Sequence, residues 1–237
     1  MNKNRVMIAG IIAIITSAAL LFSNHQPATS NSNKSTKINQ MTFKKDDWKL
    51  KLVNKEFPLS DKYSFNQAEV DSYVFDARIV DSINQFRSAA NAAGYPTTVI
   101  SGYRSLADQT SVYNNSVDSY INQGMTEAEA ITETQKTIQT PGSSEHATGL
   151  AIDLADNQAL ASHPELSASM ENYKGQQWLI NHATDYGFIL RYPSDAEAKK
   201  TTGIDYEPWH FRYVGKDAAK YMAENDLTLE ELQKEIK

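Results

Sequence analysis

The spacing of apolar residues along the chain predicts several helices. In the clearest case, residues 74–93, apolar side chains recur at steps of three and four positions, as on the buried face of a helix. Helices are expected at 74–93, 106–120, 126–138, 175–186, 216–225 and from 228 onward. Two of them begin at capping boxes, Thr126 to Glu129 and Thr228 to Glu231, and the first is expected to end at Gly94.

Short apolar segments between these helices predict four strands. They are bounded by turn-forming residues and include β-branched or aromatic side chains. Strands are expected at 97–101, 150–154, 188–192 and 209–214, and irregular segments at 155–175 and 195–205. Alternation along the last strand places His210 and Arg212 on one face and Trp209 and Phe211 on the other.

The first 45 residues follow a different pattern from the rest of the chain. A basic start precedes an apolar run at 6–22, which is at the short end of what can span a bilayer. We expect an uncleaved membrane anchor at 1–23, with a cleaved signal peptide as the alternative. A flexible tether rich in Ser, Asn, Thr and Lys is expected at 24–45, and a folded domain at 46–237.

Composition narrows the chemistry open to this domain. The chain has 237 residues and a formal net charge of −6, which argues against non-specific nucleic-acid binding, so no nucleic-acid partner is expected. It contains no cysteine, which excludes disulfides, thiolate zinc sites and cysteine nucleophiles. Any bound metal would therefore need nitrogen and oxygen ligands.

A carboxylate interrupts the apolar strand expected at 150–154. Asp153 would be costly to bury alone, and a metal ion shared with His146 is the simplest partner for it. His210, in the last expected strand, offers a third ligand. Two imidazoles and one carboxylate leave the fourth position of zinc open, which is typical of catalytic rather than structural sites. The alternative for Asp153 is a structural ion pair, for example with Arg212.

A second carboxylate lies three residues before His210. Glu207 is a candidate general base, able to take a proton from water and pass it to a leaving amine. Strand alternation alone would place positions 207 and 210 on opposite faces. Pro208 interrupts the regular ladder between them and allows their side chains to converge. The alternative for Glu207 is a solvated loop carboxylate.

Three motifs accompany these residues, in an order that resembles a known family. They are Ser101-Gly102-Tyr103-Arg104, then Ser144-x-His146-x-x-Gly149-x-Ala151-x-Asp153, then Glu207-x-Trp209-His210. Together they resemble the VanY-type zinc D-alanyl-D-alanine carboxypeptidases and their L,D-carboxypeptidase relatives, which trim bacterial cell-wall peptides. The same superfamily includes D,D-dipeptidases, murein endopeptidases and the hedgehog domain. The resemblance covers roughly residue 48 to the C-terminus.

The resemblance implies a fold and a metal site. The fold would be α+β, with a small antiparallel sheet, flanking helices and a zinc site in a groove across the sheet. One Zn²⁺ per chain would be held by His146, Asp153 and His210, with Glu207 as general base. The domain at 46–237 would then be a zinc peptidase catalytic domain.

The resemblance also implies substrate contacts. Arg104 would lie in the cleft, either as a clamp for the terminal carboxylate of the peptide or as a stabiliser of the developing oxyanion. Gln109 and Ser144 match positions that line the substrate pocket. Tyr103 is a further candidate for substrate binding, with packing alone as the alternative.

The function expected from these features is removal of the C-terminal D-alanine from peptidoglycan stem peptides, by D,D- or L,D-cleavage. The alternatives are a murein endopeptidase and a non-catalytic zinc-containing module that binds the cell wall. Glu207 argues against the second, because a binding module needs no general base. We expect a monomer that lies outside the cytoplasm, either membrane-anchored at the cell surface or secreted.

Overall fold

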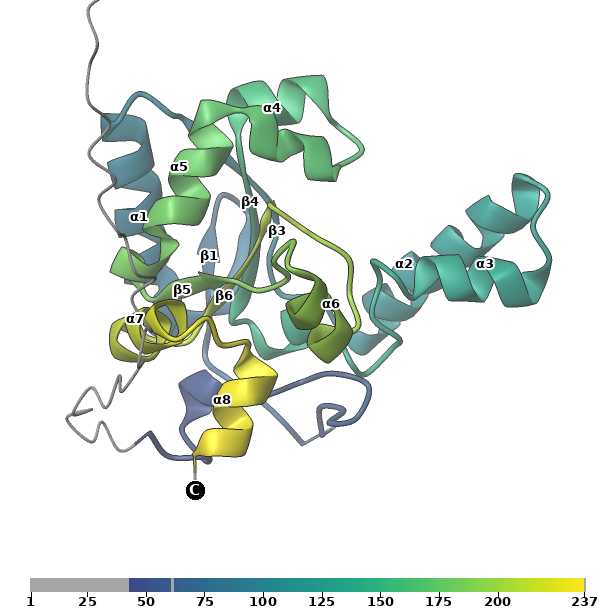
Figure 1. Cartoon of the computed structure of the whole chain (residues 1–237), viewed down its shortest axis with the longest axis horizontal. Helices are drawn as coiled ribbons and strands as arrows, with labels where there is room; N and C mark the ends of the chain where they lie inside the picture. Colours follow the sequence, from purple (N-terminus) through teal and green to yellow (C-terminus); the bar gives the residue numbers. More distant parts are fainter. Residues whose placement is uncertain (1–42, 61, 237) are drawn as a thin grey trace, which may run out of the picture. The chain divides into compact units, whose positions relative to one another are not determined.

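The computed structural model describes residues 43–60 and 62–236 (Figure 1). The expected anchor at 1–23 and nearly all of the expected tether lie outside the described residues. Within the described residues, no helix combines the length and apolar character needed to cross a membrane.

A four-stranded antiparallel sheet holds the domain together (Figure 1). Its strands lie in the order β3 (Thr97–Ser101), β4 (Ala151–Asp156), β6 (His210–Tyr213) and β5 (Phe188–Leu190). The sequence predicted all four, with ends that differ by no more than two residues. Asp153 on β4 is directly paired with His210 on β6, so two expected metal ligands occupy adjacent central strands. The α+β class is confirmed.

A small hairpin replaces the start of the first expected helix. β1 (Gln67–Val70) and β2 (Tyr73–Asp76) pair antiparallel, and the two residues between them have positive φ angles, as a tight hairpin turn requires. Helix α1 (Val80–Ala92) begins only after a 3-10 turn at Ala77–Ile79. The prediction of helix from residue 74 was therefore wrong, because the aromatic and β-branched residues of β2 also fitted a helical period.

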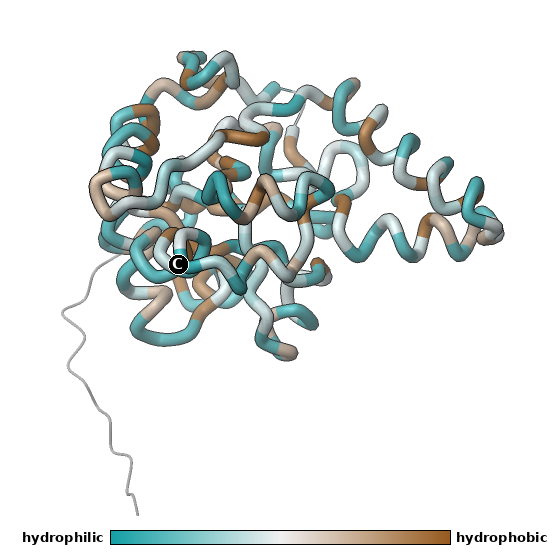
Figure 2. The backbone as a smooth tube through the Cα atoms, turned by 90° about the horizontal axis from the view of Figure 1, so that it is seen from above, coloured by the Kyte–Doolittle hydropathy of each residue, from teal (hydrophilic) through white to brown (hydrophobic). Residues whose placement is uncertain are grey.

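Seven further helices are described. They are α2 (Leu106–Asn122), α3 (Glu127–Thr134), α4 (Asn157–Ser162), α5 (Lys174–His182), α6 (Ala196–Thr202), α7 (Lys216–Glu224) and α8 (Leu229–Glu235). Both expected capping boxes form, at the starts of α3 and α8. Helices α2 and α3 form an antiparallel hairpin beside the sheet (Figure 1), and Figure 2 shows apolar residues spaced among polar ones along both.

Two segments expected to be irregular contain short helices. α4 and a 3-10 helix at Ala168–Asn172 lie within 155–175, and α6 lies within 195–205. α4 and α6 each begin at an aspartate, Asp156 or Asp195, whose side chain accepts backbone N–H groups of the first turn. These caps stabilise helices too short to show an apolar period.

The sheet has one apolar face and one polar face. Ile152 and Leu154 on β4 and Phe211 on β6 belong to the main core, which α1 and α5 cover. Phe86 of α1 lies at its centre, with its ring 5.7 Å from that of Phe211. Asp153, between the two core residues of β4, points to the opposite face. The alternation that builds the core therefore also presents the polar residues on the other side.

Candidate active site

The second motif forms a tight turn between a 3-10 helix and a central strand. The 3-10 helix Glu145–Thr148 presents His146, and Gly149 ends it in the left-handed region, at φ +71°. A Cβ atom on this glycine would lie 2.7 Å from the ring of Phe65. Both the φ angle and this close approach require glycine. The chain then enters β4, which places Asp153 beside His146.

The structure brings the three expected metal ligands together. One donor atom from each of His146, Asp153 and His210 lies within 4.8 Å of the others, and all three side chains are buried. Asp153 Oδ2 lies 3.3 Å from His146 Nε2, and Asp153 Oδ1 lies 3.1 Å from His210 Nδ1. Among the described residues, Asp153 Oδ1 has no hydrogen-bond partner despite its burial. Two imidazoles and one carboxylate with an unsatisfied oxygen fit a zinc ion.

A hydrogen bond on the side of the ring away from the expected metal position fixes the orientation of His146. Its Nδ1 donates a hydrogen bond to the carbonyl oxygen of Gly102, at 2.7 Å. Because a carbonyl only accepts, Nδ1 holds the hydrogen and the lone pair of Nε2 faces the expected metal position. Gly102 belongs to the first motif, so this bond joins the first motif to the second.

Burial and neighbouring charges shift the pKa values of the three expected ligands in different directions. Burial lowers the pKa of His146, which favours the neutral ring that a metal binds. Burial favours the neutral acid for Asp153, but His146 and His210 outweigh it and hold its pKa below the ordinary value. Burial alone would lower the pKa of His210, but Asp153 and Glu145 raise it to about 9. A metal must therefore displace a proton from His210 at neutral pH.

Glu207 lies next to the three ligands, as expected. The turn from Glu207 to His210 is closed by a hydrogen bond from the His210 N–H to the Glu207 carbonyl oxygen, at 3.1 Å. This turn places Glu207 Oε2 3.6 Å from His210 Nδ1. The side chain is buried, and burial raises the pKa of Glu207 to about 8. A carboxyl group that ionises near neutral pH can exchange protons in both directions, as a general base and acid must.

A cleft of about 410 Å³ opens over these residues. It is lined by the three ligands and Glu207, together with Arg104, Gln109 and Ser144 from the expected substrate contacts. One wall comes from α2 and from residues 137–139, which follow α3. A larger hollow of about 750 Å³ lies elsewhere, among residues that include Lys51 and Lys55, and none of the expected site residues lines it.

Arg104 is held in a fixed position at the edge of the cleft. Its Nη1 donates to Gln109 Oε1 at 2.9 Å, and its Nη2 donates to Ser101 Oγ at 3.0 Å. Gln109 is fixed in turn, because its Nε2 donates to the carbonyl oxygen of Gln139. Arg104 Nη2 also lies 4.0 Å from Asp153 Oδ2. The guanidinium is thus close enough to the ligands to contact a bound peptide.

Tyr103 does not line the cleft, unlike the other expected substrate contacts. Its ring lies 5.3 Å from that of Phe65 in an edge-on arrangement, and its backbone N–H donates to Val74. These contacts correspond to the packing alternative. The difference arises because neighbouring residues 103 and 104 point to different sides of the turn after β3.

Sequence reasoning missed two residues close to the ligands. The Tyr192 ring lies 4.9 Å from that of His210 and lines the cleft. Glu145, immediately before His146, is fully buried and lies 3.7 Å from His210 Nε2. Its position immediately before His146, inside the second motif, was the available signal, but charged residues are seldom fully buried.

The comparisons with known proteins agree with this geometry. A family model described as VanY, D-alanyl-D-alanine carboxypeptidase, matches residues 72–216, more than half of the chain. A D-alanyl-D-alanine carboxypeptidase of Enterococcus faecalis is 36% identical over 186 residues, and the match covers 78% of this chain and 65% of that protein. The chain thus spans about two thirds of the length of this relative.

Two solved structures share the fold. The first is a mutant of the vancomycin-resistance D,D-pentapeptidase VanY in complex with Zn(II), with a TM-score of 0.69 and 33% identity over 78% of this chain and 98% of the other. The second is the LD-carboxypeptidase LdcB, with a TM-score of 0.63 and 32% identity over 78% of this chain and 86% of the other. The family match includes every expected site residue from Tyr103 to His210, and the chain belongs to the VanY family of D-alanyl-D-alanine carboxypeptidases.

Proposed function

We propose that this protein is a zinc carboxypeptidase that removes the C-terminal D-alanine from peptidoglycan stem peptides. The strongest support is one juxtaposition: Glu207, a buried carboxyl group outside the ligand set, lies 3.6 Å from a ligand nitrogen of His210. The E. faecalis relative, a D-alanyl-D-alanine carboxypeptidase, supports the substrate class. The Zn(II) complex of VanY supports the choice of metal for His146, Asp153 and His210.

Glu207 is the group that moves protons in this proposal. Zinc, when bound, supplies Lewis acidity that polarises the scissile carbonyl and acidifies water. Glu207 accepts a proton from the attacking water as the new C–O bond forms. It returns that proton to the nitrogen of the departing D-alanine as the C–N bond breaks. With a pKa raised to about 8 by burial, the carboxyl group can perform both transfers near neutral pH.

Arg104 orients the substrate in this cleft. Its two hydrogen bonds, to Gln109 and Ser101, fix the plane of the guanidinium before a peptide arrives. From this position it either clamps the terminal carboxylate of the stem peptide or stabilises the oxyanion that develops at the scissile carbonyl. Both roles use the same cationic group at the same edge of the cleft.

We propose D,D-cleavage as the reaction, with L,D-cleavage as the second candidate because LdcB shares the fold. The zinc-loaded protein can be offered a pentapeptide stem ending in D-Ala-D-Ala and a tetrapeptide stem ending in one D-alanine. We expect free D-alanine from the pentapeptide at a rate at least about tenfold higher than from the tetrapeptide, because the cleft must distinguish the penultimate residue. Chromatographic quantification of released D-alanine measures both rates.

The other outcomes of this assay separate the remaining candidates. Faster release from the tetrapeptide would assign L,D-cleavage. Cross-linked stem dimers are offered as a third substrate, and their splitting without free D-alanine would assign an endopeptidase. A zinc-loaded protein that acts on none of these peptides would be a binding module and would contradict the proposed role of Glu207.

We also propose that the catalytic domain works outside the cytoplasm, anchored in the membrane or secreted. The observation that supports this location is the basic start followed by the apolar run at 6–22, and the proposed cell-wall substrate is consistent with it. Cell fractionation that recovered the full-length chain in the cytosol would contradict this location.

A further inference from the structure

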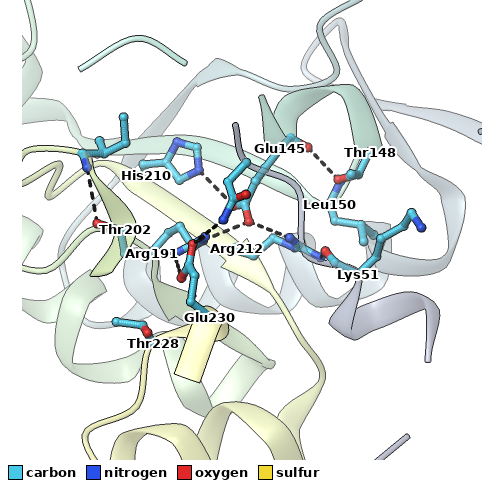
Figure 3. A network of polar contacts seen from close by, with 12 residues as sticks. Lys51, Glu145, Thr148, Leu150, Arg191, Thr202, His210, Arg212, Thr228 and Glu230 are labelled. Atoms are coloured by element: carbon cyan, nitrogen blue, oxygen red, sulfur yellow. Dashed lines mark hydrogen bonds and ion pairs between the residues drawn. The ribbon is translucent and has the colours of Figure 1, made fainter. Parts of the chain in front are cut away.

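A buried network of ionised side chains lies behind the ligand His210 (Figure 3). At its centre is Glu145, whose side chain is shielded from solvent. Glu145 Oε1 accepts hydrogen bonds from Arg191 Nε at 2.9 Å and from Arg212 Nη1 at 2.8 Å. The two guanidiniums therefore share one oxygen of the carboxylate.

The two arginines are themselves held from other directions. Arg191 donates from Nη1 and Nη2 to the two oxygens of Glu230 on α8, at 3.0 and 2.6 Å. Arg212 on β6 donates from Nη2 to the carbonyl oxygens of Lys49 and Lys51, at 3.1 and 2.8 Å. Arg191 is thus anchored to α8, and Arg212 to the backbone around Lys51 (Figure 3).

The second oxygen of Glu145 faces the metal ligand. Oε2 lies 3.7 Å from His210 Nε2, and neither atom has a hydrogen-bond partner among the described residues. If Glu145 only neutralised the arginines, both of its oxygens could pair with them. Leaving one buried oxygen without a donor would cost stability. Its position opposite the unpaired nitrogen of His210 indicates a different role.

This role follows from the chemistry of the imidazole ring. His210 Nδ1 faces the expected metal position, so it can bind a metal only when the single ring hydrogen is on Nε2. We propose that Glu145 is a positioning residue that accepts this hydrogen and fixes the metal-binding tautomer and orientation of His210. Arg191 and Arg212, which both donate to Glu145 Oε1, hold Glu145 in place for this task. The inference rests on the proposed zinc site.

The variant Glu145→Gln tests this proposal with almost no change in size. The two arginines select the amide oxygen of the new side chain, so its NH₂ group faces His210 Nε2. A donor in that place favours hydrogen on Nδ1, the tautomer that cannot bind a metal. We expect zinc affinity to fall by about 10- to 100-fold, as for other groups that orient metal-binding histidines. Competition with a chromophoric chelator at fixed pH measures the affinity.

Glu230→Gln is the matched control. It removes the same charge from the same network and weakens the same Arg191, but Glu230 does not face His210. We expect its zinc affinity to remain within about threefold of wild type, even if both variants lower the melting temperature. Equal weakening of zinc binding in the two variants would show that the network supports only the fold and would overturn the proposal.

A measurement on the wild-type protein tests the proposal even if the variants fail to fold. In the zinc-loaded protein, NMR should show a His210 Nε2–H proton that exchanges slowly and resonates downfield, as a hydrogen bond to a carboxylate requires. Zinc bound through Nε2, or a rapidly exchanging Nε2–H, would overturn the role of Glu145. Failure of the wild type to bind zinc would instead refute the proposed function, so the two results are distinguishable.

Discussion

Glu207→Gln is expected to lower kcat for D-alanine release by about 100- to 10,000-fold, the usual contribution of a general acid–base group. The amide keeps the shape of the side chain but accepts no proton at neutral pH. Because Glu207 lies beside the ligands and is not one of the three, zinc content should remain close to one ion per chain. Steady-state kinetics with a pentapeptide stem and elemental analysis measure the two quantities.

Asp205→Asn provides the control for this change. It is the same carboxylate-to-amide substitution two residues away, at a side chain that pairs with Lys199 and does not line the cleft. Its kcat should stay close to wild type. If Glu207→Gln retained more than a tenth of the wild-type kcat, another group would have to be the base.

Removal of zinc is expected to lower D-alanine release by about 1,000-fold or more, since several kcal/mol of transition-state stabilisation are lost. Activity should return when zinc is added back to the stripped protein. His146→Ala should give the same loss without a chelator, because it removes one of the three ligands. His182→Ala is the control: this ring stacks on Trp178 at 4.2 Å, away from the site, and its loss should leave zinc content unchanged.

The pH dependence of zinc binding provides a second measurement of the same site. The metal-free His210 has a pKa raised to about 9, so below that pH the ring must lose a proton before it can bind zinc. Apparent zinc affinity should therefore increase with pH by up to about tenfold per unit until it levels off near pH 9. An affinity that did not change between pH 6 and 8 would contradict His210 as a ligand.

The sequence pointed to the four residues that the structure brings together mainly because two positions depart from a local rule. Asp153 interrupts an apolar strand, and a buried carboxylate needs a partner. Pro208 interrupts a strand pattern and allows Glu207 and His210 to share a side. Each departure can be recognised from the local sequence alone. The family resemblance then indicated that these residues belong to one site.

The remaining features depend on contacts between distant segments. Glu145 is buried because Arg191 and Arg212, which are 46 and 67 residues away in sequence, neutralise it. No local pattern indicates that pairing. Tyr103 packs on Phe65, 38 residues earlier in the sequence, instead of lining the cleft. The helices α4 and α6 begin at aspartate caps and are too short for periodicity to reveal them.

The wall of the cleft formed by α2 and by residues 137–139 has a consequence for substrate preference. Asp153 and His210 lie on the paired strands β4 and β6, and Glu207 shortly precedes β6. The wall, in contrast, belongs to the continuous segment from α2 to residue 139. Substitutions at wall residues such as Val112 and Ile138 can alter which peptide enters without moving the three expected ligands or Glu207. The preference for one peptide bond over another can thus change while the hydrolytic reaction stays the same.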